Sequence, residues 1–80
     1  MIMEGAIIKA DSVIGEHCII NTGATIDHES KIRDFVHVGP GVHCRGRTVV
    51  EDDVWIGIGA SVINNIRICR ESVVGAGGIY

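Results

Sequence analysis

A histidine followed directly by a glutamate, His28 and Glu29, is the pair in this sequence best suited to acid–base chemistry. Imidazole is the usual general base near neutral pH, and a carboxylate bonded to one ring nitrogen fixes its tautomer and raises its basicity. Adjacent residues on a strand point to opposite faces, so this pairing requires a corner in the chain. A carboxylate from a neighbouring subunit is the alternative partner, and a solvated surface pair is the non-catalytic interpretation.

Gly46 lies eighteen residues after His28 and is the candidate for a second catalytic group. A glycine leaves its backbone N–H unhindered, and such a donor beside a general base can stabilise an oxyanion. The alternative interpretation is an ordinary glycine at a turn.

The other histidines and the cysteines do not predict a metal site. His37 and His43 are six residues apart, whereas a zinc-dependent carbonic anhydrase needs three histidines that converge on the ion. Cys18, Cys44 and Cys69 are odd in number and widely spaced, unlike paired zinc ligands. We therefore expect no metal, and we expect a reducing, cytoplasmic compartment.

A period of six residues defines the elements that must position these groups. From Ile2 onward, every sixth residue is Ile or Val, except Cys44 and Tyr80. A second, mostly small residue stands four positions after each of these anchors, as Ala24 and Ser30 do. Hexapeptide periods are typical of parallel β-helices, in which each side is a short strand plus a corner. The prediction is an all-β fold: one domain over residues 1–80, a left-handed parallel β-helix with 18 residues per coil and about four coils.

A second period of eighteen residues indicates three sides per coil. Glycines recur at this spacing in two columns, which are Gly5, Gly23, Gly41, Gly59 and Gly77, and Gly39, Gly57 and Gly75. Glycine there permits unusual dihedral angles or the close approach of another molecule. Corner geometry and a ligand groove are both compatible with this pattern.

The same period places the histidines relative to one another. His37 falls on a different side of the triangle from His28, so the two could meet only across a three-fold interface. Trp55 lies one coil above His37 and suggests a packed contact surface. A short prism has a narrow core, so oligomerisation is expected.

Composition excludes two classes of partner. The net charge is −3 without a basic stripe, which argues against nucleic acid. No apolar run approaches the roughly 18 residues of a membrane span, and the N-terminus lacks a signal-peptide pattern. A hydrophobic content of 46% with three aromatic residues fits an aliphatic solenoid core.

Four runs resemble the sialic-acid O-acetyltransferase family of hexapeptide-repeat acyltransferases, which includes N-acetyltransferases of nucleotide-linked 4-amino sugars. They are residues 19–29 (Ile-Ile-Asn-Thr-Gly-Ala-Thr-Ile-Asp-His-Glu), 35–41, 55–60 and 74–77. The resemblance implies direct transfer of an acetyl group from acetyl-CoA to an amino or hydroxyl group of a sugar. It implies that His28 is the general base, that Glu29 increases its basicity and that Gly46 supplies the oxyanion donor.

The resemblance also implies a homotrimer with acetyl-CoA bound in grooves between adjacent prisms. The residue matching His37 contacts the acetyl-CoA, and those matching Ile58 and Ala76 line the coenzyme path. Asn21 is a weaker candidate for orienting the substrate. The resemblance requires no metal.

Two departures from the family pattern qualify these expectations. An N-terminal nucleotide-sugar-binding domain and a C-terminal coil and tail are missing, so a truncated chain that folds but is inactive, or lacks sugar specificity, is one expected outcome. Serine- or maltose-type O-acetyltransferases are an alternative, although they interrupt the prism with a protruding loop. A non-enzymatic structural prism is the third class.

Overall fold

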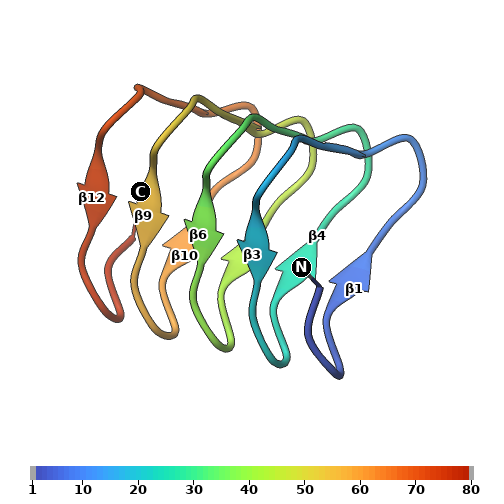
Figure 1. Ribbon diagram of the computed structural model, residues 1–80, viewed down its shortest axis with the longest axis horizontal. Helices are drawn as coiled ribbons and strands as arrows, with labels where there is room; N and C mark the ends of the chain where they lie inside the picture. The colour runs from blue at the N-terminus through green and yellow to red at the C-terminus, as the bar shows by residue number, and fades with distance from the viewer. Residues whose placement is uncertain (1, 80) are drawn as a thin grey trace.

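Twelve short strands follow one another at intervals of six residues in the computed structural model, which describes residues 2–79. Each strand has two residues: β1 Ile7–Ile8, β2 Val13–Ile14, β3 Ile19–Ile20, β4 Thr25–Ile26, β5 Lys31–Ile32, β6 His37–Val38, β7 His43–Cys44, β8 Val49–Val50, β9 Trp55–Ile56, β10 Ser61–Val62, β11 Arg67–Ile68 and β12 Val73–Val74. The chain winds through them as a coil (Figure 1). The predicted left-handed parallel β-helix is confirmed, and its last predicted anchor, Tyr80, lies outside the described residues.

Three parallel four-stranded sheets form the sides of the prism. Their strand orders are β1-β4-β7-β10, β11-β8-β5-β2 and β12-β9-β6-β3. Each residue pairs with the one eighteen positions later, as Ile7 does with Thr25 and His37 does with Trp55. The eighteen-residue coil predicted from the glycine columns is therefore confirmed.

Most positions of the two predicted inward sets form the interior, but the first predicted anchor, Ile2, is 55% exposed. Anchors such as Ile26, Ile32 and Val50 are completely or almost completely buried. The smaller residues four positions later, including Ala24 and Ala60, are buried beside them. Stacked aliphatic side chains form one continuous core, which holds the three corners of each coil at fixed positions.

Each corner contains one residue with a left-handed backbone conformation, again at intervals of six. At the corner formed by residues 3–6, 21–24, 39–42, 57–60 and 75–78, here called the glycine corner, all five are glycines with φ between 68° and 77°. The other two corners use side-chain-bearing residues with φ near 60°: Asp11, His17, Glu29, Phe35, Arg47, Asp53, Asn65 and Glu71. The backbone turn alone therefore does not explain the glycines.

Helices long and apolar enough to cross a membrane do not occur within residues 2–79.

Candidate functional site

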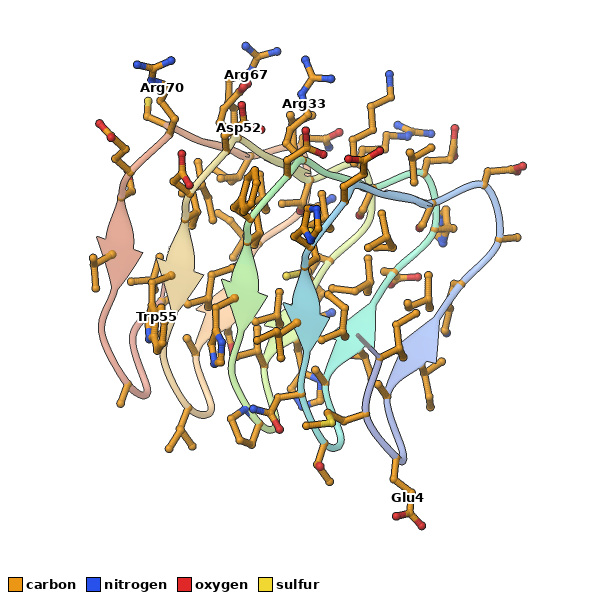
Figure 2. The ribbon with its side chains drawn as sticks, in the orientation of Figure 1. Glu4, Arg33, Asp52, Trp55, Arg67 and Arg70 are labelled. Atoms are coloured by element: carbon orange, nitrogen blue, oxygen red, sulfur yellow. The ribbon has the colours of Figure 1, made fainter. Side chains whose placement is uncertain are left out.

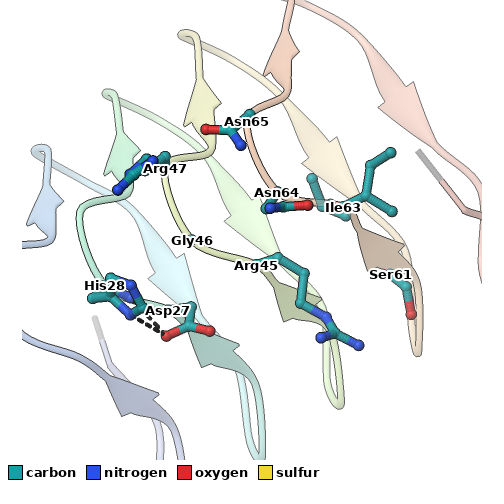
Figure 3. Close-up of a pocket in the computed structure, with 10 residues that line it drawn as sticks. Asp27, His28, Arg45, Gly46, Arg47, Ser61, Ile63, Asn64 and Asn65 are labelled. Carbon is teal, nitrogen blue, oxygen red and sulfur yellow. Dashed lines mark hydrogen bonds and ion pairs between the residues drawn. The ribbon is translucent and has the colours of Figure 1, made fainter.

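His28 lies at the corner formed by residues 9–12, 27–30, 45–48 and 63–66, here called the His28 corner. It lies two residues after the end of strand β4, and its side chain is 58% exposed. It faces a polar pocket of about 600 Å³ that spans three successive coils (Figure 3). The residues that line the pocket are Asp27, His28, Arg45, Gly46, Arg47, Ser61, Val62, Ile63, Asn64 and Asn65.

Gly46 lies directly against His28 in the next coil, as the eighteen-residue period predicts. The Arg47 N–H donates a hydrogen bond of 3.1 Å to the His28 carbonyl and fixes this stacking. A Cβ on Gly46 would lie 3.3 Å from that carbonyl oxygen and 3.5 Å from His28 Nε2. The Gly46 N–H has no hydrogen-bond partner within residues 2–79. The absent side chain thus leaves both Nε2 and a backbone donor accessible to a ligand.

Two carboxylates flank His28, and the structure gives them different partners. Asp27 Oδ1 lies 2.9 Å from His28 Nδ1 and also accepts the His28 backbone N–H at 2.8 Å. Glu29, which the sequence suggested as the partner of His28, instead lies 3.7 Å from Arg47 Nε. The His28 N–H bond lowers the pKa of the Asp27 carboxyl below its usual value, with a smaller contribution from the charge of Lys9.

A column of hydroxyl groups braces the His28 corner from inside. Ser12 Oγ donates to the Asp27 carbonyl at 2.7 Å, and Ser30 Oγ and Thr48 Oγ1 donate to the Arg45 carbonyl at 3.2 and 2.7 Å. Ser30 and Thr48 are completely buried. Buried polar groups that are satisfied in this way rigidify the backbone on which functional side chains stand. In the sequence, the signal for this column was a hydroxyl residue at every eighteenth position. The sequence interpretation considered only the small size of these residues.

The candidate coenzyme residues meet in a second, mostly apolar groove of about 520 Å³. Asn21, His37, Ile58 and Ala76 all line it, together with neighbouring residues of the glycine corner and of strands β9 and β12. The rings of His37 and Trp55 stack with centroids 4.0 Å apart, which confirms the predicted contact between these positions. Trp55 projects from the outer face of β9, away from the charged side chains Arg33, Asp52 and Arg67 (Figure 2).

Asn21 has a structural role that the sequence interpretation did not include. Its Oδ1 accepts the N–H of Thr22 at 2.8 Å, just as Asp27 Oδ1 accepts the N–H of His28 one side later. Asn21 and Asp27 therefore both cap the entry to a corner.

The two columns of glycines at the glycine corner are required for different reasons. A Cβ on Gly39 would lie 2.8 Å from the Ile56 carbonyl, and one on Gly57 would lie 2.7 Å from the Ala76 nitrogen, so these positions must be bare for the coils to stack. A Cβ on Gly23 or Gly59 would meet nothing within 4 Å. This second column presents bare backbone to whatever lies outside the prism.

Within one chain the two sites are separate. His28 follows the sheet that contains β4, whereas His37 is on β6 of another sheet, and no residue lines both pockets. His37 and His43 likewise lie on different sheets, as their six-residue spacing predicts.

The three cysteines lie in two kinds of environment. Cys18 and Cys44 are buried, and Cys69 is exposed. Burial raises the pKa of the Cys44 thiol to about 12.

Comparison with characterised proteins points to acetyltransferases. The chain is 34% identical over 83 residues to a GDP-perosamine N-acetyltransferase from Escherichia coli O157:H7, across 96% of this chain and 37% of that protein. It is 31% identical over 74 residues to a galactoside O-acetyltransferase from Lactococcus lactis subsp. lactis (strain IL1403), across 86% of this chain and 33% of that protein. The chain thus spans about a third of the length of these relatives. No protein-family model matches the sequence.

Comparison with solved structures also points to acetyltransferases. A mutant perosamine N-acetyltransferase from Caulobacter crescentus, in complex with CoA and GDP-perosamine, superposes with a TM-score of 0.96 at 40% identity, over 98% of this chain and 37% of that one. The acetyltransferase domain of PglB from Neisseria gonorrhoeae FA1090 superposes with a TM-score of 0.86 at 26% identity, over 100% of this chain and 48% of that one. In its sequence and its fold, the chain is similar to these acetyltransferases, and it carries the six-residue repeat expected of hexapeptide-repeat acyltransferases.

Proposed function

We propose that the protein transfers an acetyl group from acetyl-CoA to the amino group of a nucleotide-linked sugar, with His28 as general base. The observation that carries the proposal is the placement of His28 Nε2 against Gly46, whose N–H has no partner within the described chain. A base beside an unpaired amide is the arrangement that acyl transfer requires. The similarity to N-acetyltransferases of GDP-perosamine supports this acceptor class.

The proposed chemistry is direct transfer without a covalent enzyme intermediate. His28 Nε2 takes a proton from the acceptor amine as the nitrogen lone pair attacks the thioester carbonyl carbon. The carbonyl oxygen becomes an oxyanion, which accepts a hydrogen bond from the Gly46 N–H. The intermediate then collapses, the C–S bond breaks, and protonated His28 returns its proton to the coenzyme A thiolate.

The groove at the glycine corner suits the thin chain of acetyl-CoA. The open positions at Gly23 and Gly59 let a ligand lie against the backbone, and Ile58 and Ala76 offer apolar contact beside them. His37, stacked on Trp55, is held at the edge of this groove and is proposed to contact the acetyl end. Asn21 lines the same groove and is proposed to help orient the substrate. No metal has a role in this mechanism.

The complete site is proposed to form between copies of the chain in a homotrimer. His28 of one copy and the glycine corner of the next would then face each other and hold both substrates together, which supplies the proximity that bimolecular transfer needs. The support for this arrangement is that one chain keeps the two sites apart. Three free thiols fit a reducing cytoplasm as the place of the reaction.

A comparison of His28→Ala with His43→Ala tests the base. His43 is an exposed histidine on β7 that contacts Thr25 and lines neither site, so it is a matched control. With acetyl-CoA and GDP-perosamine as probes, His28→Ala should lower kcat by about 10²- to 10⁴-fold, while His43→Ala keeps the wild-type rate. A His28→Ala protein with wild-type turnover would remove His28 from the mechanism.

A second candidate function is O-acetylation of a sugar hydroxyl. The 31% identity to galactoside O-acetyltransferase favours it, and the same base and oxyanion donor would serve a hydroxyl nucleophile. Parallel assays with a galactoside and with GDP-perosamine distinguish the two acceptors. The primary proposal expects the amino sugar to have the higher kcat/KM.

A further inference from the structure

We infer that Asp27 is the positioning residue that fixes the tautomer of His28, whereas Glu29 pairs with the next coil. This inference rests on the proposed function of His28 as general base. It assigns separate roles to the two carboxylates that flank the imidazole in the sequence.

The contact between Asp27 and His28 is short and doubly constrained. A single oxygen, Asp27 Oδ1, lies 2.9 Å from Nδ1 and 2.8 Å from the backbone nitrogen of His28 (Figure 3). A carboxylate has no proton to donate, so Nδ1 must carry the hydrogen in this bond. The lone pair of the neutral ring is then on Nε2, the nitrogen that lies against Gly46.

Asp27 is itself held in place by its surroundings. Its backbone N–H donates to the Cys44 carbonyl at 2.9 Å, and its carbonyl accepts the Ser12 hydroxyl at 2.7 Å. Its side chain is 32% exposed, against 58% for His28. Lys9 lies one coil away from Asp27, and its charge contributes to lowering the pKa of the Asp27 carboxyl.

Glu29 is placed for a different task. Its backbone adopts the left-handed corner conformation with φ of 60°. Its carboxylate lies 3.7 Å from Arg47 Nε, and both side chains are more than half exposed. An exposed ion pair of this kind contributes little to stability.

The test compares Asp27→Asn with Glu29→Gln in the full protein. The asparagine side chain in the first variant is nearly isosteric with aspartate and can still accept the backbone N–H, so the corner should keep its fold while the negative charge disappears. Long-range ¹H–¹⁵N spectra of the imidazole report which ring nitrogen carries the proton, and kcat and KM for acetyl-CoA report the reaction.

We expect Asp27→Asn to return the ring at least partly to the Nε2–H tautomer, which imidazole side chains prefer in water, and to lower kcat by about 10²-fold with little change in KM. Glu29→Gln should leave the tautomer unchanged and kcat within about twofold. An unchanged ring spectrum in Asp27→Asn, or a loss of rate in Glu29→Gln alone, would overturn the inference.

The spectra also separate this inference from the proposed function. If His28→Ala remains active, the base assignment fails, and the ring spectra still show whether Asp27 sets the tautomer. If His28→Ala is inactive but Asp27→Asn has the wild-type spectrum and rate, the role of Asp27 fails while the base assignment stands.

Discussion

The glycine corner and the His28 corner have the same backbone turn and opposite surfaces. At the glycine corner, Gly23, Gly41 and Gly59 supply the left-handed residue, and at the His28 corner, Glu29 and Arg47 supply it. A left-handed conformation costs a side-chain-bearing residue about 1–2 kcal/mol, and the His28 corner accepts that cost in every coil that the structure describes. The glycines at the glycine corner are therefore explained mainly by a requirement for backbone without side chains, and less by the turn itself.

The buried residues beneath the two corners also differ. Beneath the His28 corner, Ser12, Ser30 and Thr48 bond to backbone carbonyls and brace it. Beneath the glycine corner, the equivalent positions include Ala24 and Ala60, which only fill space. One corner is braced so that it holds side chains in fixed positions, and the other leaves its backbone bare.

Among the variants that test this comparison of the two corners, Gly39→Ala is expected to have the largest effect. Its Cβ would lie 2.8 Å from the Ile56 carbonyl and 3.1 Å from the Ile58 nitrogen, so the coils would have to separate. We expect a loss of about 1–3 kcal/mol in the free energy of unfolding, measured by urea titration.

Gly75→Ala is the matched control, because Gly75 belongs to the same column and a Cβ there meets nothing within 4 Å. It should change the stability by less than about 1 kcal/mol. Equal losses in the two variants would show that contact between coils is not what keeps this column bare.

Gly59→Asn tests the open column, with binding as the readout. Asparagine tolerates the left-handed conformation, so the fold should remain stable, but its side chain would project into the proposed coenzyme path. We expect the Kd for coenzyme A to rise by about tenfold or more in calorimetry, equivalent to roughly 1.4 kcal/mol. Wild-type affinity in a folded Gly59→Asn protein would exclude a ligand from this corner.

The next effect is a pH dependence of stability from Cys44 on strand β7, which leads into the His28 corner. Cys44 has its pKa raised to about 12, above the ordinary value of 9.0, because it is buried. Its contribution to stability is fully present below about pH 9 and is lost as pH rises toward 12, by up to about 1.4 kcal/mol per pH unit.

Cys44→Val supplies the comparison, since Val62 occupies the equivalent position one coil later. Urea unfolding at pH 8 and pH 10 should show a smaller alkaline loss in the variant than in the wild type. The same alkaline loss in both proteins would mean that the Cys44 thiol is not protected by burial.

The smallest effect is expected from Asn65→Gly at the His28 corner. Asn65 has φ of 59°, and glycine adopts this conformation without strain. The relief of strain and the greater freedom of the unfolded chain act in opposite directions, so the melting temperature should change little. A large loss would show that the Asn65 side chain, and not the backbone turn, stabilises this corner.

The sequence predicted most of the contacts that depend on the stacking register of the coils. Because the period of six never slips, it predicted the buried anchors, and the period of eighteen predicted that Gly46 lies against His28 and that Trp55 stacks on His37. These contacts follow from backbone stacking, which one repeat determines for every coil.

The sequence could not predict contacts that depend on side-chain direction within a corner. Asp27 bonds to His28 because its rotamer turns back over the next residue, and adjacency to Glu29 was the more visible pattern. The left-handed conformation of Phe35 and Arg47 was also hidden, because such residues seldom adopt it and glycine was the expected corner residue. Bracing by Ser12 and Thr48 depends on hydroxyl orientation in the same way.

The most direct test of the shared site is complementation between two impaired variants. His28→Ala lacks the base but keeps an intact glycine corner, and Gly59→Asn keeps the base but has an obstructed corner. The two chains would be co-expressed in equal amounts and the whole population of trimers assayed for acetyl transfer at an acetyl-CoA concentration far below the KM of Gly59→Asn. If each site takes His28 from one copy and the glycine corner from the next, random mixing should restore about a quarter of the wild-type activity. Mixed trimers with no more activity than the two separate variants would contradict the account.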